Sequence, residues 1–431
     1  MGIKMVVIGA ASSYTPELFY DLAEDRGRLD VDQVTLIDLN EDKLKFIADV
    51  CDRLIRKKNL DLKLVASTKL EKGIEGADFI LPQIRVGGLN ARVRDETLPM
   101  ELDMVGNETT GAGGFVCAMR TVPVMLEIAR QVERIAPDAW ILNMSNPAGI
   151  VTEAICKHTK VRALGFCNIP INTTYALAHL LNVEPATVQL DSFGLNHLSW
   201  TQRVLVDGED QLQALLDEAY DQDSILYQHG LVENHLTPEY LQTIRMIPSW
   251  YVRYFYYPEL ILDEDRKEAH TKGVSDMQAE RELREIYLSE GYNEKAQKIL
   301  ADKGGAQYYL PVLQAVDSIV NDRGDIVIVD TKNGASMPDL PENVCVEVPA
   351  RLYKDRVEPL HVGLMPLNVR GLVQTVKAYE ELTIEAAITG SQKTAIAALM
   401  ANPLVGSYPK ARNFLNRVLE NESEYLKPFY K

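Results

Sequence analysis

The first part of the chain alternates short apolar runs with amphipathic segments, and this alternation constrains the fold more than any other feature. Such a pattern is typical of parallel strands joined by crossover helices. Strands are predicted at residues 4–9, 33–38, 62–66, 77–84, 139–143 and 161–167. Helices are predicted at residues 17–24, 42–57 and about 115–136. The pattern therefore predicts a doubly wound α/β sheet, whose order of connections it leaves open.

The alternation stops in the second part of the chain. Residues 211–300 are mostly helical in pattern, strand-like runs return at 326–329 and 344–348, and residues 364–400 are again helical. A chain of 431 residues also exceeds what one hydrophobic core normally organises. We therefore expect an N-terminal Rossmann-like domain at residues 1–190. A mainly helical α+β domain for catalysis and oligomerisation is expected at residues 191–431.

Composition excludes several classes of partner. Lys and Arg total 45 against 62 Asp and Glu, which gives a formal net charge of −17. Such a charge argues against a nucleic-acid partner or an anionic membrane. No stretch approaches the roughly 20 apolar residues of a membrane helix, so no membrane span is expected. The 5 cysteines are scattered in a chain too long to depend on disulfides, which favours a reducing cytoplasm.

The first predicted strand leads into a turn suited to an anion. Gly9 opens this turn, Ser12 and Ser13 follow, and the next helix begins with a proline and an acid, so its free N–H groups face the turn. The second and third glycines of a dinucleotide fingerprint are missing. Asp38, at the end of the second strand, can accept hydrogen bonds from a ribose and disfavours a 2′-phosphate. These residues predict NAD(H) rather than NADP(H), with a plain turn and a solvated Asp38 as the alternative.

Polar residues also follow two later strands. Asn143 and Asn146 stand where a strand ends, at the edge that faces the ligand crevice in such sheets, so both are candidates to contact the nicotinamide ribose or the substrate. A simple Asn-Pro turn is the alternative. Cys167 follows the next strand and His197 lies further on, and thiolate and imidazole are ligands for a divalent transition metal. A packed cysteine and a structural histidine are the alternative.

The aromatic run at residues 248–257 has two interpretations. Tyr251, Tyr254 and Phe255 share one face of a helix, which is most simply a core stripe. A tyrosine can also act as a base where a nearby cation lowers its pKa.

Eight segments together resemble one enzyme family, glycoside hydrolase family 4. In chain order they are residues 8–17, Arg85-Val86-Gly87-Gly88, Asp95-Glu96, residues 106–111, Asn143-Met144-Ser145-Asn146-Pro147, Cys167-Asn168-Ile169-Pro170, Gly194-Leu195-Asn196-His197 and Pro248-Ser249-Trp250-Tyr251. With residues 402–405, the resemblance extends over nearly the whole chain.

The family resembled is the NAD-dependent exception to the two-carboxylate glycosidases. The resemblance implies that NAD⁺ takes a hydride from C3 of the sugar and that a divalent metal, usually Mn²⁺, polarises the C2 and C3 oxygens. A tyrosine then removes the C2 proton, the C1 leaving group is eliminated, water adds and the hydride returns. Matching motifs assign Tyr251 as the base and Cys167 and His197 as metal ligands. Glu108 falls in the polar loop of the active site.

The resemblance also indicates a substrate. Arg92 and Asn146 would hold the sugar, and Asn168 replaces the Asp that members cleaving 6-phospho-α-glucosides carry after the metal cysteine. Because an amide cannot be a general acid, the chain resembles the 6-phospho-β-glucosidase branch. Lys272, with Arg92, is a candidate for the phosphate, although the family commonly has an arginine there and lysine lacks its bidentate fork. The alternative is an unphosphorylated or differently substituted glycoside.

Two rival functions remain at this stage. A 2-hydroxy-acid dehydrogenase of the lactate or malate kind shares the sheet, the Asn-Pro turn and a later histidine, and would show net NADH production. A non-catalytic NAD-binding protein would have no use for Cys167, His197 and Tyr251 together. The resemblance further favours a role in carbohydrate metabolism and a homodimer or homotetramer.

Overall fold

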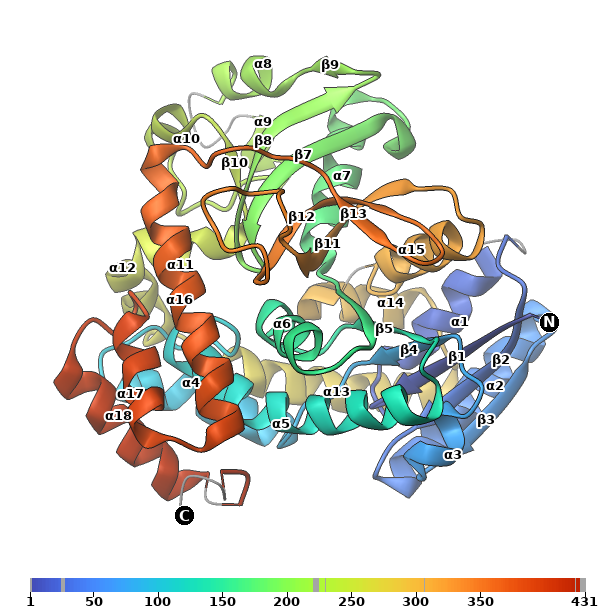
Figure 1. The fold of residues 1–431 in the computed structure, drawn as a ribbon. Helices are drawn as coiled ribbons and strands as arrows, with labels where there is room; N and C mark the ends of the chain where they lie inside the picture. The colour runs from blue at the N-terminus through green and yellow to red at the C-terminus, as the bar shows by residue number, and fades with distance from the viewer. Residues whose placement is uncertain are drawn as a thin grey trace.

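The computed structural model describes residues 2–24, 28–219, 225–228, 230–305, 307–422 and 424–426, which contain one large and one small sheet (Figure 1). The strands of the large sheet are β1 (Ile3–Ile8), β2 (Val31–Ile37), β3 (Lys63–Ser67), β4 (Phe79–Pro82), β5 (Trp140–Asn143), β6 (Arg162–Gly165), β11 (Asp325–Lys332), β12 (Cys345–Leu352) and β13 (Val357–Pro359). Their order across the sheet is β13-β12-β11-β6-β5-β4-β1-β2-β3.

The predicted doubly wound sheet is confirmed. Strands β1 to β6 pair in parallel in the order 3-2-1-4-5-6, which is the order of dinucleotide-binding folds. The helices between them are α1 (Thr15–Glu24), α2 (Glu41–Lys58), α3 (Leu70–Ile74), α4 (Gly88–Glu101), α5 (Gly111–Ile135) and α6 (Ala148–His158). All the strands and helices predicted in this part occur, and their ends differ from the predictions by four residues at most.

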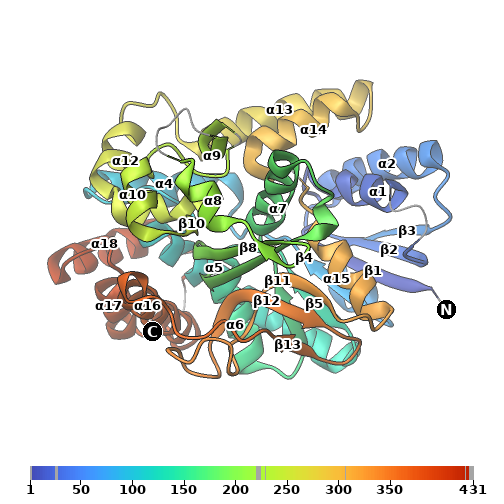
Figure 2. The ribbon, with the colours of Figure 1, turned by 90° about the horizontal axis from the view of Figure 1, so that it is seen from above.

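Alternating side chains of the central strand build two cores. Met5 and Val7 of β1 pack in a cluster with residues of α1 and α2, whereas Val6 and Ile8 pack in a second cluster with residues of α5. Because successive strand residues point to opposite faces, an apolar run fits a sheet covered on both sides. Strands β1–β3 lie at one end of the molecule and the C-terminal helices at the other (Figure 2).

Helix α5 corrects the expectation that no stretch of the chain is long and apolar enough to form a membrane helix. By length and composition alone it is the one helix in the described residues that is long and apolar enough to cross a membrane. Its most apolar window is 83% buried inside the protein, as in the core helix of a globular protein. The helix packs between the sheet and the C-terminal helices (Figure 1).

The second part of the chain extends the first sheet. Strand β11 pairs with β6 antiparallel through Asp330 and Gly165, and β12 and β13 continue outward. A Cβ at Gly165 would lie 2.3 Å from the Thr152 hydroxyl, so the close approach requires glycine. The residues on either side of the predicted division at 190 thus share one sheet, and that division stays a prediction.

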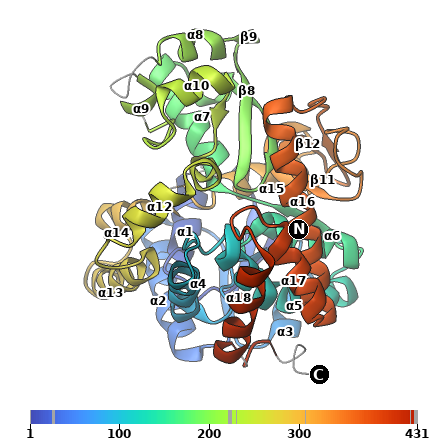
Figure 3. The ribbon, with the colours of Figure 1, turned by 90° about the vertical axis from the view of Figure 1, so that its left-hand side faces the viewer.

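A hairpin that the sequence analysis missed rises above the sheet (Figure 3). Its strands are β7 (Val188–Leu195) and β8 (Leu198–Val206), with β9 (Glu209–Asp210) and β10 (Ile247–Pro248) paired to β8. Strand β7 alternates apolar and polar residues only as far as Asp191, where a register shift against β8 puts polar Asp191 and Ser192 next to each other and interrupts the pattern that signals a strand.

The remaining helices surround this hairpin and flank the sheet. They are α7 (Asn168–Leu181), α8 (Leu212–Asp217), α9 (Ile225–Gln228), α10 (Pro238–Ile244), α11 (Arg253–Tyr256), α12 (Pro258–Asp265), α13 (Lys272–Ser289), α14 (Glu294–Leu300), α15 (Leu310–Val320), α16 (Leu367–Thr389), α17 (Gln392–Ala401) and α18 (Tyr408–Asn421). Short helical turns are η1 (Pro185–Thr187), η2 (Trp250–Val252) and η3 (Ala301–Gly305). The predicted helix at 364–400 is divided at Gly390, which ends α16 with φ 69° before Ser391 caps α17.

Candidate active site

One cavity of about 2070 Å³ lies at the carboxyl ends of the parallel strands. Ligands bind at this edge in open α/β sheets. The cavity is lined by nearly all the residues singled out in the sequence, namely Gly9, Ser12, Asp38, Arg92, Glu108, Asn146, Cys167, Asn168, His197, Tyr251 and Lys272.

The cofactor end of the cavity is a backbone turn. Gly9 has φ 83°, and a Cβ there would lie 2.9 Å from the Gln83 carbonyl oxygen, so only glycine fits. Asp38 is fixed beside it, because its Oδ2 accepts a hydrogen bond from the Ala11 N–H at 3.0 Å and its Oδ1 accepts one from the Asn40 N–H at 2.9 Å. The turn and this oriented carboxylate fit the diphosphate and ribose of NAD.

Two residues predicted to contact the cofactor do not line the cavity. The Ser13 hydroxyl is buried and donates to Glu280 Oε1 at 2.6 Å. Asn143 is fully buried, and its amide bonds to Ser145, Ala148 and Thr152. Asn143 therefore shapes the turn that carries Asn146. The sequence could not separate these roles, because a turn and a ligand use the same amide chemistry.

A thiol and an imidazole meet in the cavity wall. The distance from Cys167 Sγ to His197 Nε2 is 3.7 Å, and Thr109 Oγ1 lies 3.1 Å from His197 Nδ1. His197 occupies the turn between β7 and β8 with φ 118°, a conformation rare outside glycine and typical of constrained functional positions. The fold thus fixes the ring from its far nitrogen and presents Nε2 to the sulfur.

This pair fits a divalent metal. A separation of 3.7 Å would let one divalent ion lie within bonding distance of both Cys167 Sγ and His197 Nε2. Burial lowers the pKa of His197 to about 3, so the ring is in the neutral form that binds metals. Burial, and then Glu347, raise the pKa of Cys167, so a cation is needed to stabilise its thiolate. No group of three or more His, Cys, Asp or Glu ligands occurs in the described residues.

Tyr251 lies directly against the imidazole. Its ring stacks on His197 with centroids 3.8 Å apart and planes 9° apart, and η2 places it on the cavity wall. Burial, followed by Tyr254 and Cys167, raises the pKa of the phenol, while Arg92 and Arg253 lower it. The phenol is therefore protonated in the protein alone, and added positive charge is what would make it a base.

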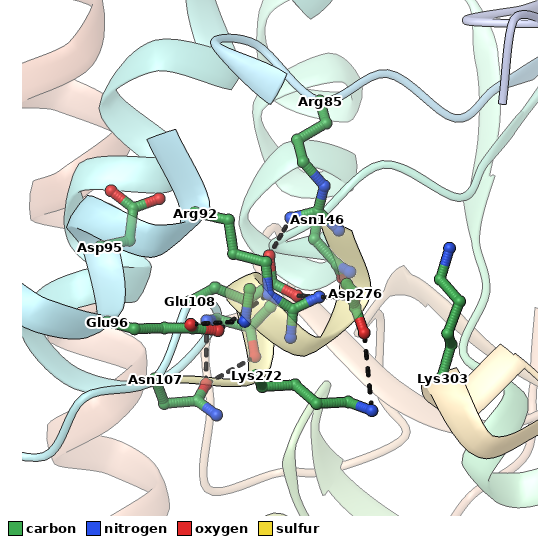
Figure 4. Close-up of polar contacts among 12 residues, drawn as sticks. Arg85, Arg92, Asp95, Glu96, Asn107, Glu108, Asn146, Lys272, Asp276 and Lys303 are labelled. Atoms are coloured by element: carbon green, nitrogen blue, oxygen red, sulfur yellow. Dashed lines mark hydrogen bonds and ion pairs between the residues drawn. The ribbon is translucent and has the colours of Figure 1, made fainter. Parts of the chain in front are cut away.

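A network of charges forms the substrate end of the cavity (Figure 4). Arg92 pairs with Glu96 at 2.8 Å, with Glu108 at 3.0 Å and with Asp276 at 2.6 Å. Glu108 also pairs with Arg85. In the described residues, these ion pairs use Nε and Nη1 of Arg92 and leave Nη2 for another partner.

Lys272 and Asn168 are both tied to the short turn η3. Lys272 Nζ donates to the Asp302 carbonyl oxygen at 3.0 Å and lies 3.5 Å from Asp276, with its side chain 48% exposed. The Asn168 amide donates to the Gly304 carbonyl oxygen at 2.7 Å. Turn η3 therefore links the strand end that carries Cys167 to the beginning of α13.

The structure adds residues that the sequence analysis did not assign. Thr109 lies in the polar loop at residues 106–111 and contacts His197. Glu347 of β12 is buried, and its carboxylate accepts hydrogen bonds from Asn196 Nδ2 and Ser199 Oγ, each at 2.9 Å, so it holds the hairpin turn that carries His197. No local pattern distinguishes Glu347 from other strand residues, because its partners lie about 150 positions earlier in the chain.

The fold and the cavity define a class: a nicotinamide-nucleotide fold with a thiol–imidazole metal pair beside a buried tyrosine. Structural similarity agrees with the first part, since a lactate dehydrogenase from a deep-sea metagenome library shares the fold at a TM-score of 0.56 and 12% identity, over 90% of this chain and 100% of that one.

Sequence comparison identifies the family. The model for "Family 4 glycosyl hydrolase" matches residues 4–183, and the model for its C-terminal domain matches residues 192–405. The chain therefore belongs to glycosyl hydrolase family 4, as the ordered motifs predicted.

Two relatives are similar over their full length. A probable 6-phospho-beta-glucosidase of Bacillus subtilis is 34% identical and covers 100% of this chain and 98% of its own. The 6-phospho-beta-glucosidase of Thermotoga maritima, solved with manganese, NAD⁺ and glucose-6-phosphate, superposes at a TM-score of 0.89 with 29% identity, over 98% of this chain and 99% of that one.

Proposed function

We propose that this chain hydrolyses 6-phospho-β-glucosides with NAD⁺ and a divalent metal, Mn²⁺ by preference. The observation that supports this most strongly is the single cavity in which the nucleotide turn, the Cys167–His197 pair, Tyr251 and Arg92 meet. A C–H beside an alcohol is too weak an acid for a protein base. The reaction therefore needs a nicotinamide, a metal and a base in the same site.

The residues that line the cavity have different roles according to their position in it. Gly9, Ser12 and Asp38 hold the dinucleotide, and Cys167 and His197 hold the metal. When bound, NAD⁺ accepts and returns the C3 hydride and the divalent ion withdraws electrons from the neighbouring sugar oxygens, which makes the C2 hydrogen acidic.

Tyr251 takes the C2 proton. Its ring is held against His197 and reaches the cavity from η2, so the phenol oxygen is positioned by the same residue that binds the metal. Glu108 acts at the polar loop, where Arg85 and Arg92 hold its carboxylate, and Asn146 contacts the sugar from the neighbouring strand end.

Arg92 and Lys272 bind the phosphate. Arg92 reaches Asp276 through Nη1, and the half-exposed ammonium of Lys272 lies 3.5 Å from the same carboxylate (Figure 4). In the described residues this leaves Arg92 Nη2 and Lys272 Nζ side by side as donors for a phosphate. Charge-assisted hydrogen bonds from both cations can fix a phosphate oxygen.

The β configuration of the substrate follows from Asn168. An amide cannot protonate a leaving group. The chain therefore lacks the acid that the 6-phospho-α-glucoside branch has at this position. The amide is also committed to the Gly304 carbonyl. The similarity to the 6-phospho-beta-glucosidase of Bacillus subtilis supports the same branch.

A second candidate is the same reaction on a glycoside without the phosphate. The observation that favours it is the number of carboxylates at the substrate end, because Glu96, Glu108 and Asp276 already pair with Arg92. Those carboxylates can accept hydrogen bonds from sugar hydroxyls, and their negative charge repels a phosphate dianion.

Hydrolysis of four p-nitrophenyl glucosides separates these functions: the β-glucoside, its 6-phosphate and the two α-anomers, each with Mn²⁺, NAD⁺ and a thiol reductant. Release of nitrophenol from the 6-phospho-β compound alone is expected, without net NADH. Activity on the unphosphorylated β-glucoside alone would favour the second candidate, and activity on neither β compound would contradict both.

We also propose a homodimer or homotetramer in the cytoplasm. Leu364 and Leu367, beside the start of α16, are 68% and 79% exposed and offer an apolar contact for a second copy. NAD and a phosphorylated sugar are both too polar to cross a membrane unaided, so the enzyme must share their compartment. Sedimentation equilibrium tests the assembly, because a monomer would give 48.3 kDa.

A further inference from the structure

The three tryptophans of the chain lie in very different surroundings. Trp200 is 1% exposed and stacks on Phe193, and Trp140 is 4% exposed with the Arg162 guanidinium over its ring. Trp250 is 45% exposed and lines the cavity. In the described residues, no ring stacks on Trp250, no cation lies over it and its indole N–H donates no hydrogen bond to another residue.

An exposed indole inside a ligand cavity needs a physical reason. An indole exposes a large apolar area, and buried aromatic rings rank among the strongest contributors to binding. Both of the other tryptophans bury this area against protein. The bare ring of Trp250 is therefore surface that a bound molecule can cover.

The position of Trp250 beside Tyr251 indicates which part of a substrate it meets. Both residues belong to η2, and successive side chains of a 3₁₀ turn diverge by about 120°. Tyr251 faces His197, so Trp250 covers a different part of the same wall. Leu231 lines the same cavity, in a segment tied to α11 by the Glu233–Arg253 ion pair at 2.7 Å.

The other walls of the cavity already have proposed occupants. The dinucleotide takes the turn at Gly9, C2 and C3 of the sugar face Cys167 and Tyr251, and the phosphate meets Arg92. The part of a glycoside that remains is the leaving group on C1. We propose that Trp250 is the platform for this leaving group and that the enzyme prefers aglycones that contain a ring, either an aryl group or a second sugar with its C–H groups on the indole face.

The preference follows from the chemistry of the indole face. Its negative π surface attracts the slightly positive edges and C–H groups of a ring laid upon it, and the contact area removes water from both. A methyl aglycone covers too little of the indole to gain this contact. The inference rests on the proposed function, since it assigns the leaving-group part of that same site.

Three 6-phospho-β-glucosides test the proposal, with phenyl, glucosyl and methyl aglycones. For Trp250→Ala, we expect KM for the phenyl and glucosyl compounds to rise about tenfold, whereas the methyl compound changes by less than about twofold. Trp250→Phe retains a ring and should stay within about threefold of the natural enzyme. Leu288→Ala, a change at an exposed leucine of α13 outside the cavity, is the control.

The outcomes separate the two proposals. A rise for the phenyl compound alone identifies aryl aglycones, and a rise for the glucosyl compound alone identifies a second sugar; either supports the platform. Equal changes for all three compounds, or a Phe variant as poor as the Ala variant, overturn it while leaving the proposed function in place. If the natural enzyme hydrolyses none of the three, the proposed function fails and the platform with it.

Discussion

The two ends of the cavity are built in different ways. The cofactor end consists of backbone from one β–α–β unit, with Gly9 and Asp38 fixed by main-chain hydrogen bonds. The reaction end consists of side chains from segments far apart, among them Cys167, His197 and Tyr251. Backbone groups remain when a side chain is truncated, so the loss of a side-chain group should be far more damaging at the reaction end.

The largest effect is expected for Tyr251→Phe. Removing the phenol oxygen removes the proposed base while the ring still stacks on His197, so kcat should fall at least about 1000-fold. NAD⁺ affinity, measured by calorimetric titration, should stay unchanged because the cofactor end is untouched. Tyr256→Phe, a tyrosine of α11 that does not line the cavity, serves as the control. Retained turnover would reject Tyr251 as the base.

Cys167→Ser should follow in size. The hydroxyl of serine is a poor ligand for a transition metal, so Mn²⁺ affinity should fall more than about 100-fold. Electron paramagnetic resonance of free Mn²⁺ measures this directly, apart from activity. Cys156→Ser changes a free cysteine of α6 that does not line the cavity and should bind Mn²⁺ normally. Chelation should abolish turnover of the natural enzyme and Mn²⁺ should restore it; a chelated enzyme that keeps full activity would contradict the metal site.

Glu347→Ala tests a residue that acts through others. Without its carboxylate, Asn196 and Ser199 lose their shared acceptor and the turn that carries His197 loosens, so Mn²⁺ affinity should fall about tenfold. Glu347→Gln keeps one acceptor and should be intermediate. NAD⁺ affinity should not change in either variant, and Glu342→Gln on the exposed loop before β12 is the control. Normal Mn²⁺ affinity in a folded Glu347→Ala protein would show that the clamp does not position the histidine.

Lys272→Ala tests the phosphate. Losing a half-exposed charge-assisted hydrogen bond should raise KM for 6-phospho-β-glucosides about tenfold and leave the unphosphorylated compound unaffected. Lys272→Arg, which adds a bidentate fork, should bind the phosphorylated compound at least as well as lysine does. Lys267→Ala, at an exposed lysine outside the cavity, provides the comparison. The same rise in KM for both substrates would remove Lys272 from the phosphate site.

The smallest effect is expected at the cofactor end. Asp38→Asn keeps one acceptor for the Ala11 and Asn40 N–H groups and should weaken NAD⁺ binding only about fivefold, while reducing discrimination against NADP⁺. Calorimetric titration with both dinucleotides measures this. A loss larger than that of Lys272→Ala for its substrate would contradict the difference between the two ends.

The sequence pattern predicted the nucleotide-binding half of the fold, because the residues that signal this half lie close together along the chain. Apolar strands such as β1 and the Asp38 that ends β2 lie within one short unit, so period and position reveal them. The hairpin β7–β8 was missed because the alternation in β7 is interrupted at Asp191 and Ser192, where the register against β8 shifts. Ser13 and Asn143 were assigned to the cofactor from their type, whereas their hydrogen bonds show them turned into the protein.

By itself, the sequence determined the doubly wound sheet, the nucleotide turn and, through ordered motifs, the glycosidase family. These properties depend on residue type and on spacing along the chain. The tertiary structure alone decided which side chains meet: the 3.7 Å approach of Cys167 to His197, the clamp from Glu347, the carboxylates around Arg92 and the open face of Trp250. Contacts between distant segments depend on how helices and strands pack, and no local pattern encodes that packing.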